Sequence, residues 1–213
     1  MIATLPGSAA DTKKKEVEAK PFVPLYQGVQ VGIELSGPAS YFLSDSWSSS
    51  VKADINLKNK FFPTLEAGYS DFDKTAENGI HFISSGTYLK VGLNIPIKMN
   101  GAKAENILYG GIHYGISSFG YDLENLVFSG GYWGDNNITS LTNEKATVGW
   151  AEAAIGLRIK VLGPFSLGWG IQYKSIINIK KGDNSNPPYI PGYGMNTKPG
   201  VGINAHLYYK LPF

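Results

Sequence analysis

The chain has 213 residues, a nearly neutral formal charge of +2 and no cysteine, so it fits a single domain without disulfides or thiolate metal sites. Arg158 is its one arginine, which argues against a nucleic-acid partner because phosphate recognition depends on guanidinium groups and a basic surface. No run of about 18 consecutive apolar residues occurs in it, so a membrane-spanning helix is excluded.

Residues 1–26 are predicted to be a leader remnant followed by a periplasmic N-terminal segment. An apolar stub over residues 1–5 precedes the small residues of 7–10, which resemble the cleavage region of a secretory signal. We expect the mature chain to start near Ala10. The alternative is a short disordered cytosolic tail, since chain termini often fray. Residues 27–213 are predicted to form one barrel domain.

Eight segments of the remaining chain alternate apolar and polar residues with a period of two, the pattern of a strand with one apolar face. In residues 49–58, for example, Val51, Ala53 and Ile55 alternate with polar neighbours. The segments have about the length of a tilted strand that crosses a bilayer, roughly 9 to 11 residues. In chain order they are residues 28–36, 49–58, 64–70, 87–95, 108–117, 150–161, 165–174 and 200–213.

The predicted fold class is all-β: an eight-stranded antiparallel up-and-down transmembrane β-barrel with a polar interior. Alternation alone would also fit a soluble barrel. The polar face combines glycines with long charged side chains, which suits a narrow lumen, whereas the opposite face would crowd Trp169 and Tyr173 into it. Long connections at one end, over residues 71–84, 118–147 and 176–199, and shorter ones at the other are typical of outer-membrane barrels.

Aromatic residues gather near both ends of the predicted strands, as the two interfacial girdles of a membrane barrel require. They are Phe61, Phe62, Tyr209 and Phe213 toward the predicted periplasmic side, and Tyr41, Trp47, Tyr69 and Tyr114 toward the other. Each also has a simpler interpretation as an ordinary strand aromatic.

The last strand ends in the alternating residues Leu207, Tyr209, Leu211 and Phe213. This ending resembles the C-terminal signal by which outer-membrane barrels are handed to the barrel-assembly machinery. Pro212 departs from that pattern, and it is tolerable only where it lies past the strand ladder or faces away from it. More broadly, the stretches GVQVGIEL, FFPTLEAGY and GTYLKVGLNIP resemble an uncharacterised family of small Bacteroidota outer-membrane proteins. We therefore expect the outer membrane of a Gram-negative bacterium, with its lipid and lipopolysaccharide, as the location.

Charged residues of both signs occupy the polar face of the predicted strands. Because an unpaired buried charge costs several kcal/mol, we expect these residues to form a paired, water-containing plug and not an open pore. The predicted interior charge network consists of Glu34, Lys52, Asp54, Glu66, Lys90, Glu152, Arg158 and Lys174, with Lys160 as a further inward candidate.

Catalysis is not expected. Some small outer-membrane barrels act on lipids with a His and Ser pair, for which His113 and Ser117 are the candidates. Four residues apart on one strand, they would lie about 13 Å apart, too far for a hydrogen bond. Glu34 or Glu152 near His206 could be proposed with equal ease. No metal-ligand spacing and no phosphate-binding loop occurs, so no cofactor is indicated.

The long connections carry large aromatic residues, which favour contact with a partner. The predicted partner-contact residues are Phe128, Tyr132, Trp133, Tyr189 and Tyr193. Two alternatives are that these aromatics fold back over the barrel mouth or form a lectin-like, adhesive surface.

The function hypothesis is a non-enzymatic, membrane-embedded accessory subunit or anchor of a larger outer-membrane complex. Its expected partners are other outer-membrane proteins or lipoproteins, in barrel assembly or surface-lipoprotein processes, and not nucleic acid. The alternatives are a lipid-modifying enzyme, a narrow channel and an adhesive surface barrel.

Overall fold

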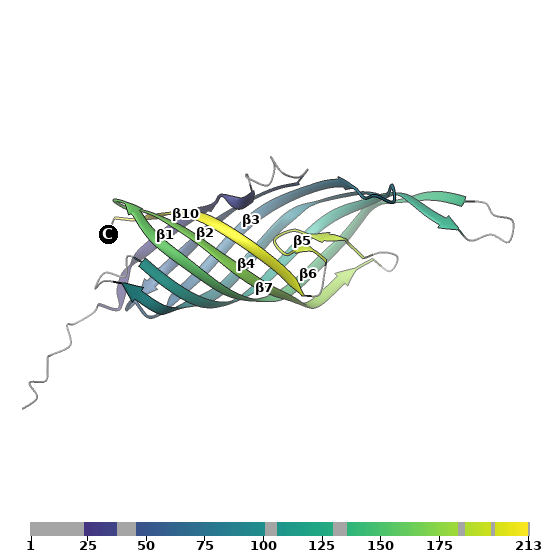
Figure 1. Ribbon diagram of the computed structural model, residues 1–213. Coiled ribbons are helices and arrows are strands. Elements are labelled where there is room, and N and C mark those ends of the chain that lie inside the picture. The colour runs from purple at the N-terminus through teal and green to yellow at the C-terminus, as the bar shows by residue number, and fades with distance from the viewer. Residues whose placement is uncertain are drawn as a thin grey trace, which may run out of the picture.

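The computed structural model describes residues 24–37, 46–100, 106–129, 136–182, 186–196 and 199–212. Eight long strands close into one antiparallel barrel in the order β1–β10–β7–β6–β5–β4–β3–β2 (Figure 1). The all-β class and the antiparallel ring of eight strands predicted from the sequence are therefore confirmed. The strands of the ring are β1 (Tyr26–Glu34), β2 (Ser46–Leu57), β3 (Phe62–Thr75), β4 (His81–Asn100), β5 (Asn106–Ser129), β6 (Asn136–Leu162), β7 (Phe165–Lys181) and β10 (Gly200–Lys210).

A short hairpin of β8 (Tyr189–Ile190) and β9 (Gly194–Met195) lies between β7 and β10 in the chain and forms a separate two-stranded sheet. Within the described ranges, no helix is long and apolar enough to span a bilayer.

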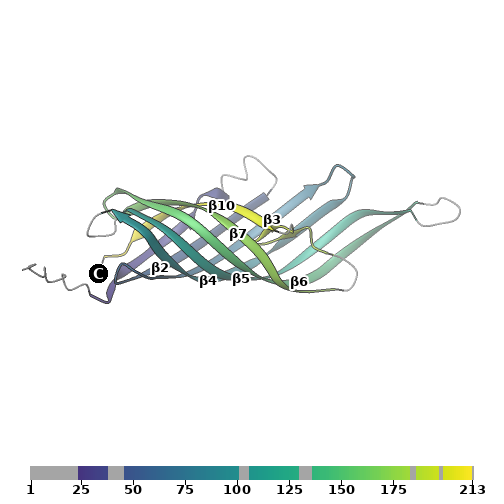
Figure 2. The ribbon, with the colours of Figure 1, turned by 60° about the horizontal axis from the view of Figure 1, so that its bottom comes forward.

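β5 and β6 extend far beyond their neighbours, as Figures 1 and 2 show. The pairing of β4 with β5 ends at His81↔Glu124, and that of β6 with β7 ends at Ala146↔Lys181. β5 and β6 continue to pair with each other as far as Ser129↔Asn136. We call residues 125–129 and 136–141 the β5–β6 arm.

In the middle of the barrel, aliphatic side chains point outward from the ring and the predicted network charges point inward, as the sequence predicted. In β2, Ile55 is 39% exposed, whereas the preceding residue, Asp54, is 1% exposed. In β5, Ile112 is 75% exposed and His113 is buried. The outer wall of the barrel is thus an apolar band.

The predicted long connections are mostly strand, so that prediction was wrong. Residues 71–75 belong to β3, residues 118–129 to β5 and residues 176–181 to β7. The two-residue alternation continues there, but the apolar residues now occupy the inward-facing positions. Phe119 and Tyr121 of β5 are buried inside, and Ser118 faces out. The exchange marks the edge of the apolar band that faces the β5–β6 arm, which we call the upper edge, and the opposite edge is the lower one.

Exposed aromatic side chains lie at both edges of the apolar band. Trp47 and Tyr69 lie near the upper edge with their ring centroids 6.1 Å apart, and Phe165 and Tyr209 lie near the lower edge at 5.3 Å. Phe62, predicted to belong to the lower girdle, is instead buried inside the barrel, because it has the inward parity of Thr64 and Glu66 on β3. Tyr41 lies outside the described residues.

The interior is polar in the middle of the barrel, in line with the prediction of a polar interior, whereas apolar clusters lie toward both ends. Toward the β5–β6 arm, an apolar cluster fills the barrel mouth. Its buried members are Phe82, Tyr88, Phe119, Tyr121, Leu123, Ala146, Val148, Trp150, Ile190 and Tyr193. A smaller cluster of Phe62, Ile107 and Tyr109 lies toward the other end.

Glycines on one strand make room for large inward side chains from the next. A β-carbon at Gly115 would lie 2.2 Å from the Trp150 ring, and one at Gly68 would lie 2.4 Å from the Tyr88 ring. The glycine-rich inner face is therefore the complement of the aromatic rings that fill a narrow lumen.

The C-terminal strand closes the ring by pairing with β1. Leu207 lies opposite Ile33 and Tyr209 opposite Val31, and Leu211 N donates a hydrogen bond to Val29 O at 3.0 Å. β10 ends at Lys210, so Pro212 lies past the ladder, the placement in which the sequence made it tolerable. Phe213 lies outside the described residues.

Candidate functional site

The charged lumen gathers residues from most of the strands of the ring. All eight interior charges predicted from the sequence point into the lumen, with Glu34 half-buried and the other seven buried. Lys160 is exposed near the end of β6. Four of the eight are basic and four acidic, so their formal charges cancel. They come from β1 (Glu34), β2 (Lys52, Asp54), β3 (Glu66), β4 (Lys90), β6 (Glu152, Arg158) and β7 (Lys174).

Arg158 organises the lower part of the network. Its guanidinium donates hydrogen bonds to the Asp54 carboxylate and to the Gln30 side-chain oxygen. The guanidinium carbon also lies 4.0 Å from the centroid of the Tyr208 ring. One side chain from β6 thereby ties together β1, β2 and β10 across the lumen, with the bidentate capacity that a guanidinium provides.

Lys90 organises the middle of the network. Its Nζ lies 2.7 Å from Glu66 Oε1 and 4.0 Å from Glu152 Oε2. His113 Nδ1 lies 3.5 Å from Glu152 Oε1, and His113 Nε2 lies within hydrogen-bond distance, 3.0 Å, of Asn94 Oδ1. These contacts connect β3, β4, β5 and β6 and fill the lumen with paired charges.

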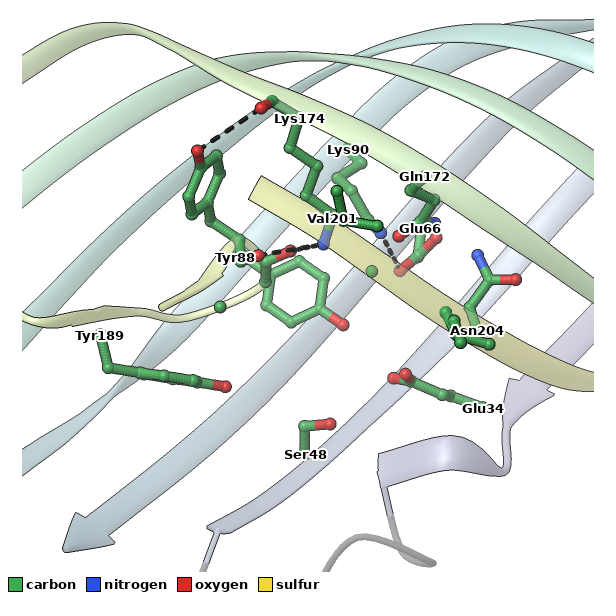
Figure 3. Close-up of a pocket in the computed structure, with 15 residues that line it drawn as sticks. Glu34, Ser48, Glu66, Tyr88, Lys90, Gln172, Lys174, Tyr189, Val201 and Asn204 are labelled. Carbon is green, nitrogen blue, oxygen red and sulfur yellow. Dashed lines mark hydrogen bonds and ion pairs between the residues drawn. The ribbon is translucent and has the colours of Figure 1, made fainter. Parts of the chain in front are cut away.

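A hairpin closes the barrel mouth above these charges. We call residues 186–196, which include β8 and β9, the hairpin lid. Lys174 Nζ donates hydrogen bonds to the carbonyl oxygens of Gly192 and Tyr193, at 2.9 and 3.2 Å (Figure 3). Gly192 has a φ of +76°, and a β-carbon there would lie 2.5 Å from the Tyr88 ring, so both the turn and the close approach require glycine.

Aromatic contacts fix the lid in the mouth. The Tyr189 ring stacks on Phe72 of β3 with centroids 4.3 Å apart, and the Tyr193 ring meets Trp150 of β6 edge-on at 5.9 Å. Ile190 is fully buried and belongs to the same apolar cluster as Trp150 and Tyr193. The lid is therefore part of the packed interior.

The predicted partner-contact residues fall into two groups. Tyr189 and Tyr193 belong to the lid, where they cover the barrel mouth as in one alternative considered from the sequence. Phe128 lies opposite Asn137 in the β5–β6 arm, but its side chain is outside the described part of the structure. Tyr132 and Trp133 also lie outside the described residues.

The proposed catalytic pair is not brought together. Ser117 Oγ donates to Thr87 O at 3.0 Å, while His113 contacts Asn94 and Glu152. Within the described ranges, no group of three or more metal-binding side chains is present.

A charged cluster that the sequence did not indicate lies outside the barrel, above the apolar band. His81 of β4 contacts Asp73 of β3 at 2.6 Å and Glu124 of β5 at 3.1 Å. Hydrogen bonds from the ring to Asp73, and then to Glu124, raise the pKa of His81 above its ordinary value. Asp73 and His81 lie eight residues apart on the two strands of one hairpin, whereas Glu124 is 43 residues further along the chain, so the strand register is needed to show that all three meet.

A family model described as "Domain of unknown function (DUF6048)" matches residues 3–213. No curated protein and no solved structure matches the chain.

Proposed function

We propose that the chain, which belongs to the family of the domain of unknown function DUF6048, is an outer-membrane β-barrel serving as a non-enzymatic anchor or accessory subunit of a larger outer-membrane complex. One observation carries the membrane assignment: the outer wall is apolar while the charges are inside. A water-soluble barrel has the opposite arrangement, because its aliphatic side chains leave water by filling the centre.

The edges of the apolar band support the same assignment. On β5, exposed aliphatic residues end at Ile116, and polar Ser118 follows on the same outward face. Aromatic rings lie at both edges of the band, where amphipathic rings are favoured at membrane–water interfaces. An apolar surface of this extent is otherwise an aggregation hazard in water.

The filled lumen supports an anchor in preference to a channel. The pairs Arg158–Asp54 and Lys90–Glu66 cross it, and the hairpin lid packs into the mouth above them. An ion would have to break these pairs to pass, and separating buried charges is costly.

The β5–β6 arm supports contact with a partner. It is a two-stranded ribbon that projects beyond β4 and β7 (Figure 2), so the outer edges of both its strands have no paired strand within the described structure. Exposed strand edges are templates for pairing with another chain. Other outer-membrane proteins or lipoproteins are the partners that this placement favours.

Membrane insertion is tested by refolding the purified chain with lipid vesicles and floating the vesicles through a density gradient after a urea wash. We expect the protein to float with the vesicles and to resist the wash. A folded protein that stays in solution without detergent would contradict the membrane assignment.

Complex formation is tested by native purification in mild detergent followed by mass spectrometry. We expect co-purifying outer-membrane proteins, and their loss when residues 125–141 are replaced by an Asn-Gly turn that joins the flanking strands. The matched control replaces residues 76–80, the tip of the β3–β4 hairpin, in the same way and should retain the partners. A wild-type monomer without partners, a lipid-modifying activity or a steady conductance in planar bilayers would each contradict the anchor role.

A further inference from the structure

β1 ends before the strands on either side of it, so the described residues leave a slot in one side of the barrel wall. Its pairing with β10 ends at Glu34↔His206, followed by one hydrogen bond from Leu35 N to Ala205 O at 2.8 Å. Its pairing with β2 ends at Ile33↔Val51. In the described part of the chain, no strand then lies between residues 46–50 of β2 and residues 200–204 of β10. We call this gap the β2–β10 slot.

The β10 edge of the slot carries backbone polar groups that have no strand partner among the described residues. Lys210 N donates toward the β7 side, to Pro164 O, whereas Ala205 O accepts from the β1 side. Because successive residues of a strand direct their backbone groups to opposite sides, the N–H and C=O groups of Val201 and Ile203 point into the slot. Hydrocarbon cannot satisfy such groups, so a membrane-embedded slot requires a polar occupant.

After the hydrogen bond from Leu35 to β10, the described chain lies against β2 at Gly37. A β-carbon on Gly37 would lie 2.0 Å from Ser48 O, so the Gly37 backbone is pressed against β2. Among the described residues, the β10 side of the slot is therefore not covered by the chain that leaves β1.

A cavity of about 200 Å³ lies behind the slot (Figure 3). Ser48 lines it from the β2 edge of the slot, and Val201 and Ile203 line it from the β10 edge. Glu34 and Lys174 reach it from inside the barrel, beneath the hairpin lid. The cavity thus connects the slot with the charged lumen.

Two charges of this cavity have no ion-pair partner among the described residues. Lys174 Nζ is held only by the carbonyl oxygens of the lid, and Glu34 Oε2 is buried without a hydrogen bond, while Glu34 Oε1 accepts from Ser36 Oγ at 2.7 Å. The other two lining charges, Lys90 and Glu66, pair with each other. One ammonium and one carboxylate remain, and their complement is a zwitterion that carries a phosphate and an ammonium group.

We propose that the β2–β10 slot binds a phospholipid with an ethanolamine headgroup, which enters the cavity sideways from the bilayer. Lys174 would donate to the phosphate and Glu34 would accept from the primary ammonium, while the N–H groups of Val201 and Ile203 donate to phosphate or ester oxygens. The acyl chains would lie on the outer wall, where the Val201 and Ile203 side chains are 70% and 76% exposed. This inference rests on the proposed membrane location.

Quenching by brominated lipids tests the proposal, because the chain contains no cysteine and a single one can be labelled. A fluorophore is attached through Val201→Cys at the slot or, as the matched control, through Ile155→Cys on the exposed outer wall of β6. Each protein is placed in phosphatidylglycerol vesicles that contain brominated phosphatidylethanolamine as a minor component. We expect that lipid to be enriched near position 201 on the order of tenfold over position 155, as one charge-assisted hydrogen bond provides.

Variants of Glu34 separate headgroup recognition from general lipid contact. In the Val201→Cys background, Glu34→Gln should abolish the enrichment, whereas Glu77→Gln in the exposed β3–β4 turn should leave it intact. Brominated phosphatidylcholine should show less enrichment, because its quaternary ammonium cannot donate to a carboxylate. Equal quenching at both positions, or none at position 201 alone, would overturn the lipid site. Absence of quenching at both positions would instead contradict membrane insertion.

Discussion

Arg158 on β6 and Asp54 on β2 form an ion pair across the barrel, although 104 residues separate them in the sequence. Both side chains are buried, and the guanidinium also holds Gln30 and the Tyr208 ring. This contact links strands on opposite sides of the ring. It therefore opposes any change in the shape of the barrel.

Removing one partner of this pair should be strongly destabilising. We expect Arg158→Met to lower the free energy of unfolding by about 3–5 kcal/mol, because it leaves the buried Asp54 carboxylate without its counterion. The double variant Arg158→Met with Asp54→Leu should recover much of the loss. Urea titration of the protein in vesicles measures these differences. Lys180→Met, an exposed lysine of β7, is the matched control, and an equal loss in that variant would contradict a special role for the pair.

Filling the space at Gly115 should disturb the barrel mouth. A β-carbon there would overlap the Trp150 ring, so we expect Gly115→Ala to cost about 1–3 kcal/mol through overpacking and to shift tryptophan fluorescence. Gly120→Ala on the same strand is the control, because its β-carbon would meet only Glu144 O, at 3.8 Å. Unchanged stability and fluorescence in Gly115→Ala would show that the ring has room to move.

The sequence was sufficient to identify eight strands and the outward face of each. Alternation of apolar and polar residues with a period of two indicates a strand and also shows which of its faces is apolar. The sequence-based strand assignment failed where β5 passes from Ile116 to Phe119. The apolar residues face outward up to Ile116 and inward from Phe119 on, so a single alternating pattern does not continue through this point. A search for inverted alternation would have extended the strand. The inverted segment was instead interpreted as a loop.

The contacts within the lumen could be predicted only in kind. Mixed charges on one face indicate pairing, but which residues pair depends on the closure and register of the ring, as the distant partners Arg158 and Asp54 show. The hairpin lid could not be predicted from sequence periodicity, because β8 and β9 have only two residues each. Its placement depends on long-range contacts to Lys174, Phe72 and Trp150.

A charge placed on the outer wall should distinguish a lipid environment from water. We expect Ile112→Arg, in the apolar band, to lower the free energy of unfolding in vesicles by about 2–4 kcal/mol, the cost of an arginine near the bilayer midplane. Ser118→Arg is exposed on the same strand and face, above the band, and should change stability by less than about 1 kcal/mol. Equal effects of the two variants would contradict the proposed position of the membrane edge.

The His81 cluster should make the upper barrel wall pH-dependent. Its contacts with Asp73 and Glu124 raise the pKa of His81 in the folded protein. The stabilisation is therefore fully present below the unfolded value of about 6.5 and is lost as the pH rises through the higher folded value. Proton NMR of the His81 ring should give a titration midpoint above the ordinary histidine value, and hydrogen exchange at the β3–β4 end should accelerate as the pH passes it, beyond the intrinsic pH dependence.

Variants on β3 provide the comparison for this titration. Asp73→Asn should lower the His81 midpoint, because it removes the carboxylate that accepts the shorter hydrogen bond, whereas Asp71→Asn, exposed two residues earlier on the same strand, should leave it nearly unchanged. A wild-type midpoint at or below the ordinary value would mean that the ring does not engage the carboxylates in solution. Because His81 lies above the apolar band, the same titration in vesicles should match that in detergent, and a large difference would place this cluster within the bilayer.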